Sequence, residues 1–243
     1  MTIKSKIKKL LKNPYAISDK LRGINPNETI AFLQAITLLG KIEMLIDVGS
    51  HKGNFIKAGQ RFFPDLKVEA FEPLKNVFEV KGKNINFHNI GLSDKTEQVD
   101  FYVPKIDSRS SILKIKKGSD KLYKGVEDYT KTKINVDRFD NLNIKIERPS
   151  MLKVFTQGSE FRVLKGFGDR LKEIDIIKIE YNFDKCYEHD VNLSEIVSFL
   201  EKWGFNGIFQ EGLCYLGEES LNRLSHCYFL FFRIKKVEDD RNK

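Results

Sequence analysis

Residues 45–54 read Leu-Ile-Asp-Val-Gly-Ser-His-Lys-Gly-Asn, and this stretch decides the fold. An apolar run carries one acid near its end, Asp47, and is followed by two glycines, Gly49 and Gly53, and then by a helical pattern. A strand, a glycine turn and a helix in this order build the nucleotide crevice of open α/β sheets. The spacing G-x-x-x-G differs from the dinucleotide fingerprint G-x-G-x-x-G, so an ordinary strand-to-helix turn is the alternative interpretation.

A second acid follows the next expected strand. Residues 67–71 form a short, apolar-rich run that ends in Glu72-Pro73, and a proline has no N–H with which to continue a strand. An acid at this place lies beside the first glycine turn, where it can accept hydrogen bonds from the two hydroxyls of a ribose. Asp47 and Glu72 are 25 residues apart, close to the spacing of about 20 expected for a ribose acid. A lone Glu after a strand is otherwise a solvated loop residue, so its pairing with the glycine turn supports the ribose role.

The composition suits a folded α/β protein. Of the 243 residues 41% are hydrophobic and 12% aromatic, enough for the core of one large domain or two small ones. No run approaches the roughly 18 apolar residues of a membrane span, and the lysine-rich start lacks the apolar region of a secretory signal. Cys186, Cys214 and Cys227 form no C-x-x-C pair, which indicates reduced thiols in a cytoplasmic protein. The four histidines show no metal-ligand spacing, so no metal site is expected.

The net charge of +8 is concentrated at the N-terminus. Residues 1–24 contain seven Lys or Arg against one Asp, with Ile and Leu at helical spacing among them. Such a helix can lie on an anionic membrane surface or on nucleic acid. We prefer the interpretation that it is a solvated helix whose apolar edge packs on the rest of the protein. Peripheral membrane contact through this helix is kept as a hypothesis. The rest of the chain is nearly neutral, and the Asn/Asp-Pro-Pro-Tyr/Phe motif that grips a flipped base is absent, so no nucleic-acid partner is expected.

Helices and strands are predicted to alternate along the chain. Helices are predicted at residues 26–39, 53–63, 74–80, 159–171 and 193–203. Strands are predicted at residues 43–48, 67–71, 84–89, 134–136, 151–155 and 174–181. A hairpin of 208–210 and 214–216 around Glu211-Gly212 and a last aromatic strand at 227–234 complete the pattern. This order predicts an α/β fold with a doubly wound, mostly parallel sheet and an antiparallel strand at one side.

A long polar segment interrupts this alternation. Residues 98–103 alternate like an antiparallel strand, and residues 107–132 are rich in Ser and Lys with few periodic signals. Loops of this length in a compact domain are usually functional or mobile, so the segment can act as a substrate lid, and Ser110-Ser111 can contact substrate or simply form a turn. We expect a basic helical extension at 1–40, one domain at 41–237 with a loop or lid at 104–132, and a charged tail at 238–243.

Several motifs follow one another in a recognisable order over about residues 42–210. They are Ile46-Asp-Val-Gly-Ser-His-Lys-Gly-Asn54, Ala70-Phe-Glu-Pro73, Asn89-Ile-Gly-Leu-Ser-Asp94, Arg138-Phe-Asp140, the run from Leu152 to Gly166, and Ile177-Lys-Ile-Glu-Tyr181. No single motif is specific, but together the chain resembles the FkbM-type S-adenosylmethionine-dependent methyltransferases. The resemblance implies a seven-stranded, Rossmann-like methyltransferase sheet and S-adenosyl-L-methionine (SAM) as the cofactor and methyl donor.

The same resemblance implies roles for individual residues. The methionine part of the cofactor would lie against Asp47, Gly49, Ser50, His51, Gly53 and Asn54. Glu72 would hold the ribose, and the segment Leu92-Ser93 would border the adenine. Family members typically methylate hydroxyl groups of sugars and other secondary metabolites. An O-methyltransferase with a small-molecule or glycan acceptor, such as a surface polysaccharide, is therefore expected.

One position departs from the family pattern. The usual motif has an Asp two residues before the Gln or Glu of its Q/E-G pair, and here that position is Phe155, before Gln157-Gly158. A Phe side chain can neither take a proton nor bind a metal. Three interpretations stay open: another group such as Glu180, Gln157 or His51 serves, the acceptor is activated by its position alone, or the protein binds SAM with little or no turnover and acts as a binding module.

Glu180 is the strongest remaining acid. It lies near the end of a predicted strand, where open α/β sheets place ligand residues. The alternative is a structural acid paired with Lys178 or Lys153. Tyr181 and Tyr187 can wall an acceptor site, or they are core residues with one polar end.

Overall fold

The structure of the protein is a computed structural model that describes residues 26–119, 123–216 and 223–234. The basic helix expected within residues 1–24 and the charged tail at 238–243 lie outside the described residues. Among the described residues, no helix combines the length and the apolar character needed to cross a bilayer.

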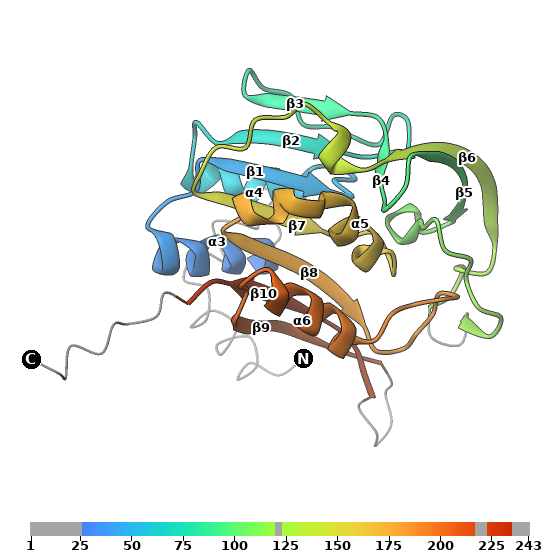
Figure 1. Cartoon of the computed structure of the whole chain (residues 1–243). Coiled ribbons are helices and arrows are strands. Elements are labelled where there is room, and N and C mark those ends of the chain that lie inside the picture. Colours follow the sequence, from blue (N-terminus) through green and yellow to red (C-terminus); the bar gives the residue numbers. More distant parts are fainter. Residues whose placement is uncertain (1–25, 120–122, 217–222, 235–243) are drawn as a thin grey trace, which may run out of the picture.

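A seven-stranded sheet forms the centre of the molecule (Figure 1). Its strands, in spatial order, are β3 (Ile85–His88), β2 (Lys67–Phe71), β1 (Met44–Val48), β7 (Ser150–Val154), β8 (Ile176–Asn182), β10 (Arg223–Phe232) and β9 (Gly207–Leu216). Neighbouring strands are parallel from β3 to β8, and β10 is antiparallel to both β8 and β9. The predicted doubly wound, mostly parallel sheet with an antiparallel last strand is confirmed.

The predicted hairpin around Glu211-Gly212 is wrong. Residues 207–216 form one strand, β9, and the chain reverses only between β9 and β10. Glu211 lies opposite Tyr228 and Cys214 opposite His226, so β9 carries one extra residue between these pairs. Gly212 has a φ of +50°, which a glycine in a β-bulge adopts without strain. The turn residues therefore mark a bulge in this strand rather than its end.

Among the described residues, four α-helices cover the two faces of the sheet, as Figure 1 shows for α5 and α6 in front. They are α3 (Pro26–Leu39), α4 (Asn54–Phe62), α5 (Glu160–Phe167) and α6 (Leu193–Lys202). Successive strand residues point to opposite faces, so Leu45 packs in the cluster that contains α3 and α4, while Ile46 packs in the cluster that contains α5 and α6. Both clusters are apolar at the amino-terminal halves of the strands.

Two helix predictions need correction. Residues 74–80 are turn and coil, because Phe78 stacks on Phe87 with ring centroids 4.4 Å apart and Val80 packs over Gly53. The predicted helix 159–171 ends at Phe167, where Gly168 takes a φ of +51°. It continues as the 3₁₀-helix η4 (Gly168–Glu173). Tertiary contacts and a glycine thus override the helical periodicity of both segments.

A second sheet of three strands stands at the carboxyl ends of the central strands (Figure 1). Its order is β4 (Gly91–Leu92), β6 (Tyr129–Asp137) and β5 (Glu97–Pro104). The antiparallel strand predicted at 98–103 is therefore confirmed, whereas the last residues of the expected loop 107–132 belong to β6. The segment between β5 and β6 begins with the 3₁₀-helix η1 (Asp107–Arg109) and is anchored by bridges from Ser111 to Tyr102 and from Ile115 to Tyr187.

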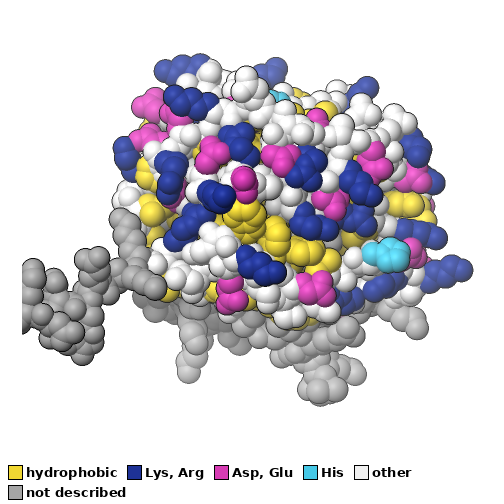
Figure 2. All heavy atoms as spheres, viewed as in Figure 1, with side chains coloured by type: hydrophobic (Ala, Val, Ile, Leu, Met, Phe, Trp, Pro, Cys, Tyr) yellow, Lys and Arg dark blue, Asp and Glu magenta, His cyan; other side chains and the backbone are white. Residues whose placement is uncertain are grey.

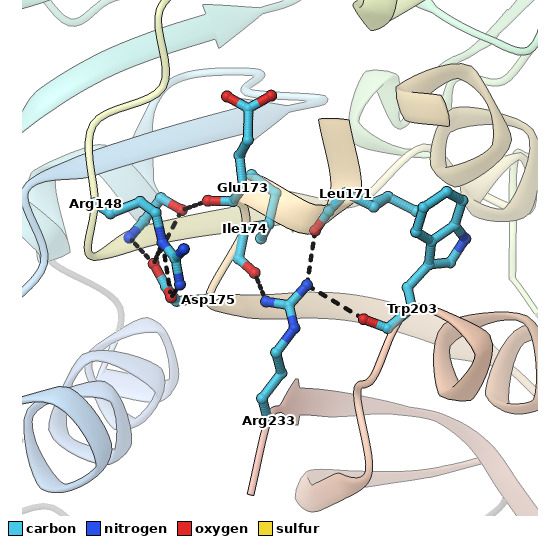
Figure 3. Close-up of polar contacts among 8 residues, drawn as sticks. Arg148, Leu171, Glu173, Ile174, Asp175, Trp203 and Arg233 are labelled. Carbon is cyan, nitrogen blue, oxygen red and sulfur yellow. Dashed lines mark hydrogen bonds and ion pairs between the residues drawn. The ribbon is translucent and has the colours of Figure 1, made fainter. Parts of the chain in front are cut away.

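Two arginines tie the opposite, amino-terminal edge of the sheet together (Figure 3). Arg233 donates hydrogen bonds to the carbonyls of Ile174, Leu171 and Trp203, which end η4 and α6. Arg148 pairs with Asp175, and Ser150 N donates to the same carboxylate at 2.9 Å. These contacts are structural, and the candidate site lies at the other edge of the sheet.

Candidate functional site

A cleft lies at the carboxyl ends of β1, β2 and β7, between the central sheet and the small sheet. It contains about 570 Å³ of space, including its open mouth. Open α/β sheets bind ligands at this edge. Of the residues predicted to bind the cofactor, Gly49, His51, Glu72 and Leu92 line this cleft.

The glycine turn has the backbone that its sequence demands. Gly49 has a φ of +73°, and a Cβ placed on it would lie 2.0 Å from the carbonyl oxygen of Phe155. Gly53 also has a φ of +73°, and a Cβ there would lie 2.2 Å from Val80 Cγ2. Only glycine fits both positions, and Gly49 lets the turn lie directly against the end of β7.

Three predicted residues support the turn without lining the cleft. The hydroxyl of Ser50 is buried and donates to the carbonyl of Asp47 at 2.6 Å. Asp47 is fully buried, and its Oδ1 lies 2.9 Å from Lys153 Nζ, which also donates to the carbonyl of Gly49 at 2.6 Å. Asn54 is exposed at the start of α4. The structure thus places Asp47 behind the turn as the partner of a buried lysine.

Glu72 lies directly beside the glycine turn. Its Oε2 accepts a hydrogen bond from His51 N and its Oε1 accepts one from Leu74 N, each at 2.9 Å. Burial raises the pKa of Glu72 above its usual value, while these two N–H groups oppose the shift. A carboxylate oxygen can accept more than one hydrogen bond, so each oxygen retains acceptor capacity for a hydroxyl in the cleft. Glu72 therefore fits a ribose diol.

An apolar slot lies beside Glu72. All four residues that line it come from the small sheet: Leu92 from β4, Phe101 from β5, and Ile134 and Val136 from β6. A flat purine base suits such a surface. Ser93, in contrast, is buried, and its carbonyl lies against Gly166. Sequence analysis did not identify Phe101, Ile134 and Val136 as residues of the site. The alternation at 98–103 predicts a strand, but no local pattern shows that this strand faces the cleft.

The segment after β5 forms one wall of the cleft. Asp107, Ser110 and Ile112 line it, and Asp107 Oδ1 lies 3.0 Å from Nε2 of His51. Ser111 points inward and donates to the carbonyl of Gln157 at 2.8 Å. Of the Ser110-Ser111 pair, one serine therefore faces the cleft and the other anchors the segment.

Gln157 is the polar side chain at the inner end of the cleft. Its Nε2 donates to Glu180 Oε2 at 2.7 Å, and its Oε1 lies 3.1 Å from the hydroxyl of Tyr187. Its φ of +55° is uncommon for a residue with a side chain, and such backbone strain clusters at functional sites. The two contacts fix which way the amide faces, so its remaining N–H and lone pair have a defined direction.

Glu160 holds the loop that carries Gln157. Its two carboxylate oxygens accept hydrogen bonds from Thr156 N at 2.7 Å and Gly158 N at 2.9 Å. Complete burial raises the pKa of Glu160 to about 8. The hydroxyl of Thr156 lines the same part of the cleft and has no hydrogen-bond partner within the described structure. A ligand with hydroxyl groups would supply one.

Glu180 does not pair with either lysine considered from the sequence. Lys178 pairs with Glu211, and Lys153 pairs with Asp47. Glu180 instead accepts a hydrogen bond from Gln157 and lies 3.8 Å from His226 Nε2. His226 was missed in the sequence, because its place opposite β8 follows only from the strand pairing.

Phe155 fills the position of the family's acid with an aromatic ring. It lines the cleft, and its ring stacks on that of Tyr228 with centroids 5.2 Å apart. Tyr187 is buried. The hydroxyl of Tyr181 accepts a hydrogen bond from Leu193 N at 3.0 Å. Within the described ranges, no group of three His, Cys, Asp or Glu side chains is arranged to hold a metal ion.

The sequence matches the family model of the methyltransferase FkbM domain over residues 47–206. No curated protein matches it. Similar solved structures include precorrin-6y C5,15-methyltransferase from Geobacter metallireducens GS-15, with 9% identity, a TM-score of 0.45 and coverage of 85% of this chain and 87% of that one. Another is the N-terminal domain of human METTL16 in complex with SAH, with 10% identity, a TM-score of 0.46 and coverage of 93% and 82%. The family match alone spans more than half of the chain, and the protein therefore belongs to the FkbM family of SAM-dependent methyltransferases.

Proposed function

We propose that the protein transfers a methyl group from SAM to a hydroxyl group of a sugar, a polysaccharide or a secondary metabolite. The observation that carries the proposal is the arrangement of Glu72, the apolar slot and Gln157 along one cleft. Glu72 would hold the ribose and the slot would hold the adenine. Gln157 would then face the methyl group from the acceptor side.

The residues of the acceptor side suit a neutral, hydroxyl-bearing molecule. The amide of Gln157 and the hydroxyls of Thr156 and Ser110 can donate and accept hydrogen bonds at the cleft. SAM, when bound, supplies a methyl group on a positively charged sulfur. Transfer to a hydroxyl is a direct displacement, to which positioning contributes a large part of the rate.

The alternative is a family member that binds SAM without turnover, since Phe155 cannot act as an acid or a base. Calorimetry with S-adenosylhomocysteine (SAH) tests binding, and transfer of a tritiated methyl group to methyl hexosides and to cell extract tests turnover. We expect both. Binding without transfer, followed by transfer in Phe155→Asp but not in the apolar control Phe155→Leu, would favour the alternative. Absence of SAH binding would contradict the proposal altogether.

We also propose a cytoplasmic protein without a nucleic-acid partner. Figure 2 shows Lys and Arg side chains interspersed with Asp and Glu over the visible face rather than a continuous basic patch, and a phosphate-binding surface needs such a patch. Cys186 is a buried cysteine that forms no disulfide among the described residues. Peripheral membrane contact through residues 1–24 stays a separate hypothesis, and unchanged binding to anionic vesicles after deletion of these residues would remove it.

A further inference from the structure

A row of polar side chains leads from the cleft to the last strand of the sheet. It starts at Gln157, passes to Glu180 on β8, and reaches His226 on β10. Neither of these two contacts depends on the acid that is missing at position 155. We propose that Glu180 and His226 act as a proton-accepting pair for the acceptor hydroxyl, a role that rests on the proposed O-methyl transfer.

Glu180 lies behind the cleft and is connected to it through Gln157. It is 8% exposed, and it is held by Gln157, which lines the cleft. The donated bond occupies Oε2, while Oε1 is directed toward the imidazole of His226 at 3.8 Å. Because both nearby lysines are paired with other acids, no ammonium group neutralises this carboxylate directly.

His226 is placed to receive a proton from Glu180. Its Nδ1 lies 3.1 Å from the hydroxyl of Ser225, so a tautomer that donates from Nδ1 leaves the lone pair of Nε2 facing Glu180. The charged groups that face the ring are Glu180, Asp184 and Arg109, and the ring of Tyr228 packs against it at 5.9 Å. Burial lowers the pKa of His226, and the two acids oppose that shift. The ring is therefore neutral near pH 7 and able to accept a proton.

The proton balance of the transfer follows from this arrangement. A lone pair of the acceptor oxygen forms the new O–CH₃ bond, and the C–S bond breaks with its electrons remaining on sulfur. The hydroxyl proton passes to Glu180 and then to Nε2 of His226. The product is an imidazolium beside a carboxylate, and the negative charge of Glu180 offsets part of the cost of burying that cation.

The first test needs no acceptor. The ring signals of His226 are followed by NMR against pH in the SAH-bound wild type and in Glu180→Gln. We expect the substitution to lower the midpoint of the His226 titration, because it removes a negative charge from beside the ring. A midpoint that does not move would overturn the proposed pair.

The second test uses tritiated methyl transfer to methyl hexosides. We expect His226→Gln to reduce kcat at least about tenfold and Glu180→Gln about 100-fold, with the low-pH limb of the kcat profile displaced and the Kd for SAH unchanged. His189→Gln, at an exposed histidine, is the control, and His226→Asn replaces His226→Gln if the latter does not fold. An active wild type whose pH profile survives in the His226 variants would overturn the pair alone. A wild type that methylates none of these acceptors would count against the proposed function as well.

Discussion

Replacing Glu72 with Gln isolates the contact that we assign to the ribose. The substitution keeps the shape of the side chain and one carbonyl oxygen, but it removes the charge and one acceptor. In the wild type, one oxygen is bonded to His51 N and the other to Leu74 N, and each retains capacity for one ribose hydroxyl. The variant therefore weakens the interaction with one of the two hydroxyls.

The expected size follows from the energy of a hydrogen bond to a charged group, which is about 1.5–3 kcal/mol. Loss of one such bond corresponds to about a 10- to 150-fold weaker affinity for SAH. Because burial raises the pKa of Glu72, protonation of this carboxyl starts at a higher pH than for an exposed Glu. The wild-type affinity should therefore fall as the pH is lowered toward that range, and the variant should lose this dependence.

Isothermal titration calorimetry with SAH measures both effects, and Glu69→Gln is the matched control. Glu69 lies on β2, the strand that Glu72 directly follows, and is similarly buried, but its carboxylate is held by Asn86 and His88, away from the cleft. We expect Glu69→Gln to lower the melting temperature with little change in Kd. If Glu72→Gln binds SAH within twofold of the wild type, or if the control weakens binding equally, the assignment of the ribose site is wrong.

Three further outcomes can be measured. Gly49→Ala should abolish SAH binding and destabilise the protein by more than the roughly 1–2 kcal/mol of left-handed backbone strain, because its Cβ would meet the carbonyl of Phe155. The control is Gly40→Ala, at a φ of +77° with no atom within 4 Å of the added Cβ. In urea unfolding, this control should lose only the free energy of the backbone strain. In the folded protein Glu160 has a pKa of about 8, above its unfolded value, so between these two values only the folded state holds the proton. The free energy of unfolding should therefore decrease by a few kcal/mol as the pH rises from about 4.5 to 8. If the pH dependence of the free energy of unfolding is the same in Glu160→Gln, this prediction is wrong. Asp107→Asn should increase the dissociation rate of SAH about two- to fivefold in stopped-flow measurements, which is the size expected for loss of one partly exposed ion pair. The control Asp128→Asn removes an exposed pair with Lys105 on the same segment and should leave the dissociation rate unchanged.

The sequence reveals the elements whose requirements are local. A strand, a glycine turn and a helix at residues 44–62 follow from apolar runs, from positions that only glycine can occupy and from helical periodicity. The acid at the end of β2 is visible for the same reason. Periodicity fails at residues 74–80, where Phe78 and Val80 find partners far away in the sequence.

The tertiary structure alone assembles the rest of the site. It brings Asp107 onto His51, places Ile134 beside Leu92, and brings His226 within 3.8 Å of Glu180. The members of these pairs are about 40 to 56 residues apart, and no local pattern links them. Their meeting depends on the strand order, the register and the packing of the small sheet against the large one, and these are properties of the folded whole. The local pattern therefore determines where the cofactor turn forms, and the three-dimensional packing decides which side chains surround it.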